Sequence, residues 1–245
     1  MTGGLAAIPM ADDRKLPIQP ANAEVEAFLR RVAAAPAPRP GGRSGRLLFG
    51  MDATASREPT WDRACRIQGE MFAETAALGG LAIQLAYYRG FGEFEAMPWI
   101  KQASLLQQRM SAVSCRGGQT QIARLLRHAI AETKREKVDA LVFVGDCMEE
   151  DADAICHLAG QLGLLGVPAF IFHERGEARA ARTFQEIARL TRGAYCRFDA
   201  GSARQLRELL AAVAVYAAGG RTALQDYSRR TGGATLLLAT FADKG

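Results

Sequence analysis

One carboxylate and two hydroxyl groups stand at alternate positions directly after a short apolar run. The run covers residues 46–51 (RLLFGM), and Asp52, Thr54 and Ser56 follow it. Side chains two positions apart in extended backbone point to the same side, so these three are predicted to converge where a strand ends. Oxygen atoms from few carboxylates, neutral groups and water suit Mg²⁺. The triplet therefore predicts a cation site, and a simple cap on the helix that follows is the alternative interpretation.

Two further oxygen-bearing residues are predicted to reach the same place. Thr120 follows a Gly-Gly-Gln sequence (residues 117–119) at the expected start of a helix, and Asp146 ends an apolar run at residues 139–145 (DALVFVG). The loops beyond the carboxyl ends of parallel strands gather at one edge of a sheet, where ligands of such sheets bind. Each of these residues alone is equally well explained as a helix cap. Their combination with the triplet favours metal ligation.

The elements that would position these residues alternate between apolar runs and amphipathic segments. Strands are predicted at residues 46–51, 81–88, 139–145, 167–172 and 195–198, with a short edge strand in the FEAM segment at residues 94–97. Helices are predicted at residues 59–78, 100–110, 120–135, 178–192 and 202–217, and another follows the acidic residues 146–153. Strands that alternate with helices imply right-handed crossovers. We therefore expect a doubly wound α/β fold, with a mostly parallel central sheet and helices on both faces.

Composition divides the chain into three regions. Residues 1–45 are rich in Pro, Gly and Ala and are expected to form a flexible arm. Its amphipathic patch at residues 25–32 is expected to dock either on the domain or on a partner. Residues 46–218 are expected to form the α/β domain, and residues 219–245 a C-terminal extension. For the apolar end of that extension, residues 234–241, a final strand and a segment that wraps on the domain are both open.

Composition and charge argue against several classes of protein. The chain has 245 residues and a net charge of +5, with no leader-like start and no apolar run near the ~20 residues that span a bilayer. A cytoplasmic location without membrane contact is therefore expected. Five cysteines without a C-x-x-C pair predict reduced thiols. Arginines interleaved with acidic residues, without a recognition motif beside them, argue against a nucleic-acid partner. The Arg- and Ala-rich composition is in keeping with a bacterial source.

The oxygen-bearing residues together resemble the metal-ion-dependent adhesion site of von Willebrand factor A (VWA) domains. They are Asp52, Thr54, Ser56, Thr120 and Asp146. The family pattern is D-x-S-x-S, then a Thr in a Gly-containing loop, then an Asp that ends a hydrophobic strand. The resemblance covers about residues 46–217 and includes a family-like segment at residues 187–198 (IARLTRGAYCRF). Thr54 replaces the usual serine and keeps its hydroxyl, and Cys147 stands where the family often has Gly.

The resemblance implies a VWA/Rossmann-like three-layer sandwich that holds a divalent cation, Mg²⁺ or else Mn²⁺ or Ca²⁺. By analogy, the hydroxyls of Thr54, Ser56 and Thr120 would contact the cation, and Asp52 and Asp146 would bind it directly or through water. In the family an acidic residue of a partner protein commonly provides the last ligand. The implied function is therefore metal-dependent protein binding without catalysis. Bacterial relatives often work beside AAA+ ATPases, so such an assembly is the partner that the analogy suggests.

The main alternative is a metal-assisted phosphoryl-transfer or hydrolytic enzyme that uses the same site. Asp52 in an Asp-x-Thr sequence resembles the nucleophile of phosphatases that form an aspartyl-phosphate. The second Asp of an Asp-x-Asp sequence is missing, however, and Lys137 precedes a strand at the opposite end of the predicted sheet. A nucleotide-binding fold is a weaker alternative, because the sequence has neither G-x-x-x-x-G-K-[ST] nor a G-x-G-x-x-G after the first strand. Binding is therefore preferred to catalysis.

Other polar residues near the predicted site are not predicted to bind the metal. The acidic residues that follow Asp146 are interpreted as partners of a helix dipole; they are Glu149, Glu150, Asp151 and Asp153. Cys156 and His157 are adjacent on a predicted helix and point about 100° apart, so they do not form a catalytic pair. His128 and His173 are interpreted as packing or surface residues.

Overall fold

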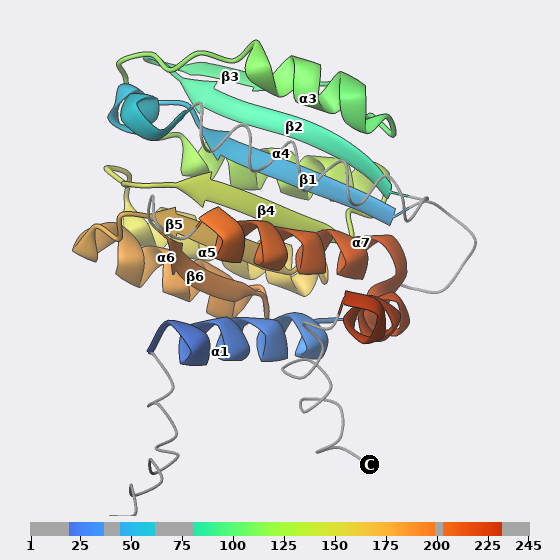
Figure 1. The fold of residues 1–245 in the computed structure, drawn as a ribbon. Helices are drawn as coiled ribbons and strands as arrows, with labels where there is room; N and C mark the ends of the chain where they lie inside the picture. The colour runs from blue at the N-terminus through green and yellow to red at the C-terminus, as the bar shows by residue number, and fades with distance from the viewer. Residues whose placement is uncertain (1–19, 37–44, 62–80, 199–202, 232–245) are drawn as a thin grey trace, which may run out of the picture.

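A six-stranded sheet between two layers of helices forms the centre of the molecule (Figure 1). The computed structural model describes residues 20–36, 45–61, 81–198 and 203–231. The strand order is β3-β2-β1-β4-β5-β6, and every neighbouring pair is parallel except β2–β3. The strands are β1 (Gly45–Asp52), β2 (Leu81–Arg89), β3 (Glu93–Ala96), β4 (Ala140–Gly145), β5 (Ala169–Glu174) and β6 (Ala194–Phe198). The predicted mostly parallel sheet with one short edge strand is therefore confirmed.

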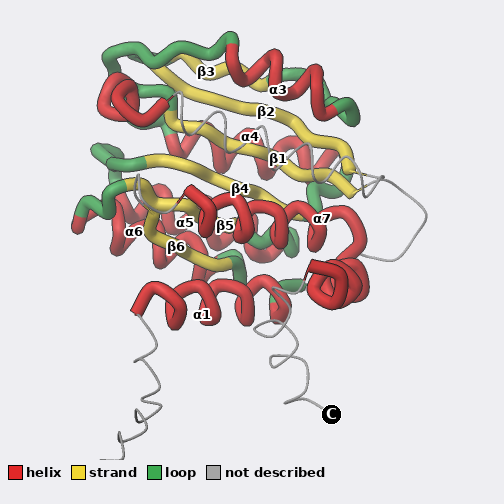
Figure 2. The backbone as a smooth tube through the Cα atoms, viewed as in Figure 1, coloured by secondary structure: helices red, strands yellow, loops and turns green. Residues whose placement is uncertain are grey.

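Helices cover both faces of this sheet (Figure 2). One layer consists of α4 (Ile122–Arg135), α5 (Ala152–Leu164) and α6 (Ala178–Leu190), which pack against one another in sequence order. The other layer consists of α1 (Pro20–Ala34), α3 (Ala103–Ser111) and α7 (Ala203–Thr231). The doubly wound α/β architecture is thus the one that the alternating sequence pattern predicts.

The central strands are apolar at consecutive positions because both of their faces are covered. In β1, Leu47, Phe49 and Met51 belong to the core beneath α1 and α7, whereas Leu48 belongs to the core beneath α4 and α5. All eight residues of β1 are buried. A strand with this pattern cannot slide by one residue without exchanging its two sets of side chains between the cores.

The amphipathic patch of the N-terminal region lies on the sheet. It is part of α1, which packs on α7 and on β6. Phe28 of α1 is 1% exposed, and its ring centroid lies 6.1 Å from that of Phe170 and 5.3 Å from that of Phe172. Of the two docking sites left open by the sequence, this structure has the patch on the domain.

Two helices begin later than the sequence predicts because long-range hydrogen bonds occupy their first residues. Ile100 pairs with Ile83 in both directions at 2.8 Å, which keeps it extended, so α3 begins at Ala103 and not at residue 100. The N–H group of Thr120 donates to Glu149 Oε2 at 3.0 Å, and α4 begins at Ile122. Both corrections arise from contacts between segments that are distant in sequence.

The helix predicted at residues 202–217 is longer than expected. Helix α7 continues to Thr231 across a break at Gly219 and Gly220, where Gly220 has a φ of 66° that favours glycine. A 3₁₀ helix, Ala55–Thr60, begins two residues beyond the end of β1. Most of the helix predicted at residues 59–78 and the apolar segment at residues 234–241 lie outside the described residues.

Helices of the described ranges are too short or too polar to cross a membrane. The described cysteines have free thiols, as predicted; they are Cys115, Cys147, Cys156 and Cys196.

Candidate metal centre

The segment that follows β1 brings the oxygen atoms of Asp52, Thr54 and Ser56 together. Asp52 is the last residue of β1 and is buried, and Thr54 keeps an extended backbone (φ −77°, ψ 160°) before the 3₁₀ helix begins. Asp52 Oδ1 accepts hydrogen bonds from Thr54 N–H at 2.8 Å and from Thr54 Oγ1 at 2.6 Å. Thr54 Oγ1 lies 3.1 Å from Ser56 Oγ. The alternation in sequence thus places one carboxylate and two hydroxyls on one side.

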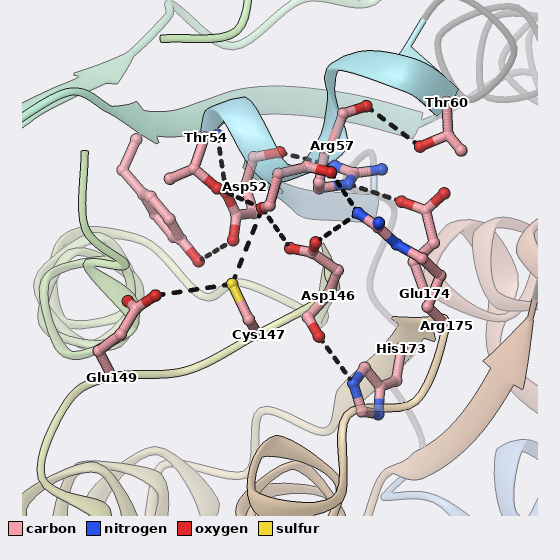
Figure 3. Close-up of polar contacts among 12 residues, drawn as sticks. Asp52, Thr54, Arg57, Thr60, Asp146, Cys147, Glu149, His173, Glu174 and Arg175 are labelled. Atoms are coloured by element: carbon pink, nitrogen blue, oxygen red, sulfur yellow. Dashed lines mark hydrogen bonds and ion pairs between the residues drawn. The ribbon is translucent and has the colours of Figure 1, made fainter. Parts of the chain in front are cut away.

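Asp146 joins this group from the neighbouring strand. It follows β4, which pairs with β1 in parallel, so the carboxyl ends of the two strands lie side by side. Ser56 Oγ donates to Asp146 Oδ1 at 3.1 Å, and Asp146 is 5% exposed. We call Asp52, Thr54, Ser56 and Asp146 the oxygen cluster (Figure 3). Four of the predicted site residues therefore form one hydrogen-bonded group.

Thr120, the remaining predicted ligand, is bonded to Glu149. Its hydroxyl donates to Glu149 Oε2 at 2.9 Å and accepts from Glu149 N–H at 3.2 Å. The loop before it approaches the β2–β3 turn closely, because a Cβ at Gly118 would lie 2.0 Å from the carbonyl oxygen of Gly90. The structure places Thr120 at the same edge of the sheet, with its hydroxyl committed to Glu149. Its ligation of a metal stays a prediction.

The acidic residues after Asp146 bind backbone N–H groups at helix starts. Glu150 accepts from the N–H groups of Ile122 (2.5 Å) and Ala123 (3.0 Å), in the first turn of α4. Asp151 accepts from the N–H of Ala154 at 2.8 Å and caps α5. The interpretation of these acids as helix-dipole partners fits both residues, although Glu150 serves a helix that precedes it in sequence.

A buried ion pair lies beside Asp52. Arg57 is 0% exposed and donates through Nε to Glu174 Oε2 at 2.9 Å and through Nη1 to the carbonyl oxygen of Asp52 at 2.6 Å. Its Nη2 is buried, and no hydrogen-bond partner for it occurs among the described residues. Burial lowers the pKa of Arg57, but the charges of Glu174 and Asp52 raise it overall. Arg57 is therefore a fixed positive charge that ties the end of β1 to the end of β5.

A second arginine lies at the exposed rim of the cluster. Arg175 donates through Nη2 to Asp146 Oδ2 at 2.8 Å and also to the carbonyl oxygen of Ser56. Its side chain is 51% exposed, and its backbone is left-handed with a φ of 60°. Neither arginine is among the residues predicted from the sequence to form the site. The signal for Arg57 was its place directly after the triplet, whereas Arg175 gave no such signal.

Asp52 is surrounded by groups that bind its carboxylate from both sides. Tyr88, buried in β2, donates to Asp52 Oδ2 at 3.1 Å, opposite the bonds from Thr54. Burial raises the pKa of Asp52 to about 6, against the opposing effects of the Thr54 hydrogen bonds and the Arg57 charge. The Asp146 charge raises the pKa of Asp52 further. A cation here would relieve this repulsion between the carboxylates.

His173 holds the backbone of Asp146 in place. It is buried at β5, with Nε2 3.1 Å from the carbonyl oxygen of Asp146 and Nδ1 2.9 Å from the hydroxyl of Tyr195. Burial lowers the pKa of His173. A neutral imidazole has one donor and one acceptor nitrogen, which suits a carbonyl on one side and a hydroxyl on the other. His173 is therefore a packing residue, as predicted, and it also positions Asp146.

The donor set fits a divalent cation. Two carboxylates and two hydroxyls converge, and one ligand atom each from Asp52, Asp146 and Cys147 lie within 4.8 Å of one another. Burial and the Asp146 and Asp52 charges raise the pKa of the Cys147 thiol far above its usual value. Arg57 and Arg175 compensate part of the negative charge. The oxygen donors are of the kind that Mg²⁺, Mn²⁺ and Ca²⁺ prefer.

Comparison with known proteins bears on the fold. No known family model and no curated protein sequence matches the chain. Among solved structures, it is similar to a von Willebrand factor type A protein from Catenulispora acidiphila, at 13% identity and a TM-score of 0.58. That match covers 70% of this chain but only 43% of the Catenulispora chain.

Two further solved structures have a fold similar to that of this chain. The SpRpn10 VWA domain is 13% identical with a TM-score of 0.54, and the match covers 70% of this chain and 94% of that domain. Proximal thread matrix protein 1 from the mussel byssus, solved with a zinc-occupied MIDAS motif, is 16% identical with a TM-score of 0.53. The latter match covers 70% of this chain and 45% of the mussel chain. The resemblance to VWA domains is therefore confirmed at the level of the fold.

Proposed function

We propose that this chain, which has the fold of a VWA domain, binds partner proteins through a divalent cation held by the oxygen cluster. The observation that supports this most is the run of hydrogen bonds, 2.6–3.1 Å long, that links Asp52, Thr54, Ser56 and Asp146 at the ends of β1 and β4. Ligands of parallel α/β sheets bind at this edge. The mussel protein, with zinc in its MIDAS motif, supports a metal role for the same fold.

Each residue of the cluster has a distinct part in this proposal. Asp52 and Asp146 provide negative charge, while the Thr54 and Ser56 hydroxyls provide neutral oxygen atoms. Tyr88 and Thr54 hold the Asp52 carboxylate, and His173 holds the Asp146 backbone. A bound cation would supply an electrophilic position for a carboxylate from outside the chain. We therefore propose a protein with an exposed Asp or Glu as the partner, and an AAA+ assembly stays a prediction from the resemblance.

Two residues define how the site would accept such a carboxylate. Ligation by Thr120 would require its hydroxyl to leave Glu149, to which it is bonded at 2.9 Å and 3.2 Å. Arg175 is half-exposed next to Asp146, and its planar guanidinium suits a second contact to an incoming carboxylate. Charge recognition at the rim and coordination in the cluster would then act on the same partner residue.

The enzymatic alternative has less support from the described residues. Lys137, the lysine considered for phosphate neutralisation, donates to the carbonyl oxygens of Leu165 (2.6 Å) and Gly166 (2.8 Å). These contacts place it before β4 and β5, at the edge of the sheet opposite Asp52. Asp52, the proposed nucleophile of that alternative, is 0% exposed and has both oxygens hydrogen-bonded. We therefore propose that the chain is not an enzyme.

Thermal unfolding tests the cation site directly. The wild type is unfolded in EDTA and in excess Mg²⁺, Mn²⁺, Ca²⁺ or Zn²⁺, together with Asp52→Asn, Thr120→Ala and Asp146→Asn. A cation at 100 times its dissociation constant adds about 2.7 kcal/mol to the free energy of unfolding. We expect this gain in the wild type and its loss in the two Asp variants. For each protein, the result is the free energy of unfolding with the cation minus that in EDTA. The value in EDTA alone does not test the site, because removing a buried carboxylate also changes the stability of the metal-free protein.

Asp153→Asn is the matched control, because it removes one exposed carboxylate near the start of α5 and outside the cluster. It is expected to keep the full metal-induced gain. A wild type that gains nothing from any of these cations, Zn²⁺ included, or an Asp52→Asn variant that gains as much as the wild type, would contradict the proposal. Partner binding is then tested by capture from a lysate of the source organism. Capture should require the cation and fail with Asp146→Asn.

A further inference from the structure

Cys147 brings a sulfur atom to the oxygen cluster. Its Sγ lies 3.8 Å from Ser56 Oγ, and it lies within 4.8 Å of the ligand oxygens of Asp52 and Asp146. We propose that Cys147 is a thiolate ligand of the cation in this cluster, so that the site selects a thiophilic divalent cation such as Zn²⁺ over Mg²⁺. This inference rests on the proposed function, because it names the cation and one more ligand at the same site.

The position of the thiol follows from the local chain. Cys147 comes directly after Asp146 at the end of β4 and is only partly buried. Its sulfur lies between Ser56 Oγ, at 3.8 Å, and Glu149 Oε1, at 3.7 Å. Figure 3 shows the sulfur pointing towards the cluster, with the Glu149 carboxylate on its other side. The side chain thus faces the carboxylates and not the apolar core.

The distances suit a zinc-like ion after small movements. Zn–S bonds are about 2.3 Å and Zn–O bonds about 2.1 Å long, so the sulfur and oxygen ligands of one tetrahedral ion lie about 3.6 Å from one another. The three ligand atoms lie within 4.8 Å of one another, so side-chain rotations that shorten these separations by up to about 1 Å would bring them to the spacing of a zinc site. Two carboxylates and one thiolate would be three protein ligands, and Ser56, water or a partner carboxylate would be the fourth. Mg²⁺ gains little from sulfur, whereas Zn²⁺ binds thiolate well.

The binding step balances without a redox reagent. The S–H bond of Cys147 breaks, a bond from sulfur to the cation forms, and one proton leaves. Glu149 Oε1 accepts the S–H hydrogen bond, and Glu149 is exposed, so its carboxylate is placed to pass the proton to solvent. Zn²⁺ remains Zn²⁺ throughout. The net charge of the ligand set falls by one when the thiolate forms, which strengthens its attraction for a divalent ion.

Cobalt absorption distinguishes a sulfur ligand from a site of oxygen atoms alone. The full chain is freed of metal with EDTA, titrated with Co²⁺, and followed in the near ultraviolet, where sulfur-to-cobalt charge transfer absorbs. The same titration is made with Cys147→Ser, Cys147→Ala, Cys156→Ser and Asp52→Asn. We expect the charge-transfer band in the wild type and in Cys156→Ser, and its loss in both Cys147 variants. Zn²⁺ affinity should fall by at least about tenfold in Cys147→Ser, with Mg²⁺ affinity unchanged.

The outcomes separate this inference from the proposed function. Co²⁺ binding without a charge-transfer band, with equal affinity in Cys147→Ser, would overturn the thiolate ligand and leave the cation site standing. A band that persists in both Cys147 variants or disappears in Cys156→Ser would also overturn it. If neither Zn²⁺, Co²⁺ nor Mg²⁺ shifts the unfolding temperature of the wild type, both proposals fail.

Discussion

Asp52 has a carboxylate that is buried, held by hydrogen bonds on both oxygens, and close to a second acid. Burial raises its pKa from 3.8 to about 6 in the folded chain. Between about pH 4 and pH 6 the folded state therefore holds a proton that the unfolded state releases. Stability from this group is complete below pH 4 and is lost as the pH rises through that window. The direction is opposite to that of an ordinary salt-bridged aspartate.

In the metal-free protein, the stability contributed by Asp52 should therefore decrease as the pH rises. We expect the free energy of unfolding of the wild type, relative to Asp52→Asn, to fall by up to about 3 kcal/mol between pH 4 and pH 7. Urea unfolding in EDTA at four pH values measures the difference. Equal pH profiles for the two proteins would show that the carboxyl group is not perturbed. With a saturating cation the difference should instead grow in favour of the wild type as the pH rises.

Arg57 is the buried positive charge that neutralises Glu174 and lies beside Asp52. Its partner Glu174 is 2% exposed, so removing Arg57 would leave that carboxylate buried without its cation. We expect Arg57→Met to lower the free energy of unfolding by about 3–5 kcal/mol. Arg189→Met, which removes an exposed ion pair with Glu186 on α6, should leave it nearly unchanged. Chemical denaturation measures both, and equal effects would contradict a structural role for the buried pair.

At the scale of elements, the strands and the start of α6 were predictable, whereas the starts of α3 and α4 were not. Apolar runs such as residues 139–145 indicate strands covered on both faces, and β4 is such a strand. The first turn of α4 depends instead on Glu149 and Glu150, which lie 27–29 residues later in the sequence than the N–H groups that they bind. A local pattern does not contain that information. For the same reason the sequence brought Thr120 to the right edge but did not reveal that Glu149 holds its hydroxyl.

The glycine loop before α4 provides an element-scale prediction. A Cβ at Gly118 would lie 2.0 Å from the Gly90 carbonyl oxygen, whereas one at Gly117 would meet nothing within 4 Å. We expect Gly118→Ala to separate this loop from the β2–β3 turn and to lower the free energy of unfolding by about 1–3 kcal/mol. Gly117→Ala should leave it nearly unchanged. Urea unfolding of the pair tests this, and two equally stable variants would rule out the close approach.

At the scale of the whole molecule, the two helical layers differ in how predictable they were. Layer α4–α6 follows from the regular alternation of strands and amphipathic helices between residues 120 and 198. The opposite layer joins α1 and α7, from the two ends of the described chain, and their contact is a matter of tertiary packing. For residues 1–45, composition predicts a flexible arm, because Pro, Gly and Ala dominate around a short apolar patch.

Phe28 tests the contribution of α1 to the stability of the whole molecule. It is buried against Phe170 and Phe172, so Phe28→Ala should lower the free energy of unfolding by about 3–5 kcal/mol. Phe91→Ala, at an 84% exposed position in the β2–β3 turn, is the matched control and should be close to neutral. Thermal and urea unfolding of both variants measure this. A neutral Phe28→Ala would mean that α1 is not part of the cooperative core.

The separation in sequence of the clustered oxygens determines when the site forms during folding. Ser56 and Asp146 are 90 residues apart, and Arg57 and Glu174 are 117 apart. Contacts over such distances form only after the entropy of closing long loops has been overcome. No fragment with β1 but without β4 contains the cluster. A newly synthesised chain therefore gains its ability to capture a cation, and to recruit what docks there, only once its central strands have paired.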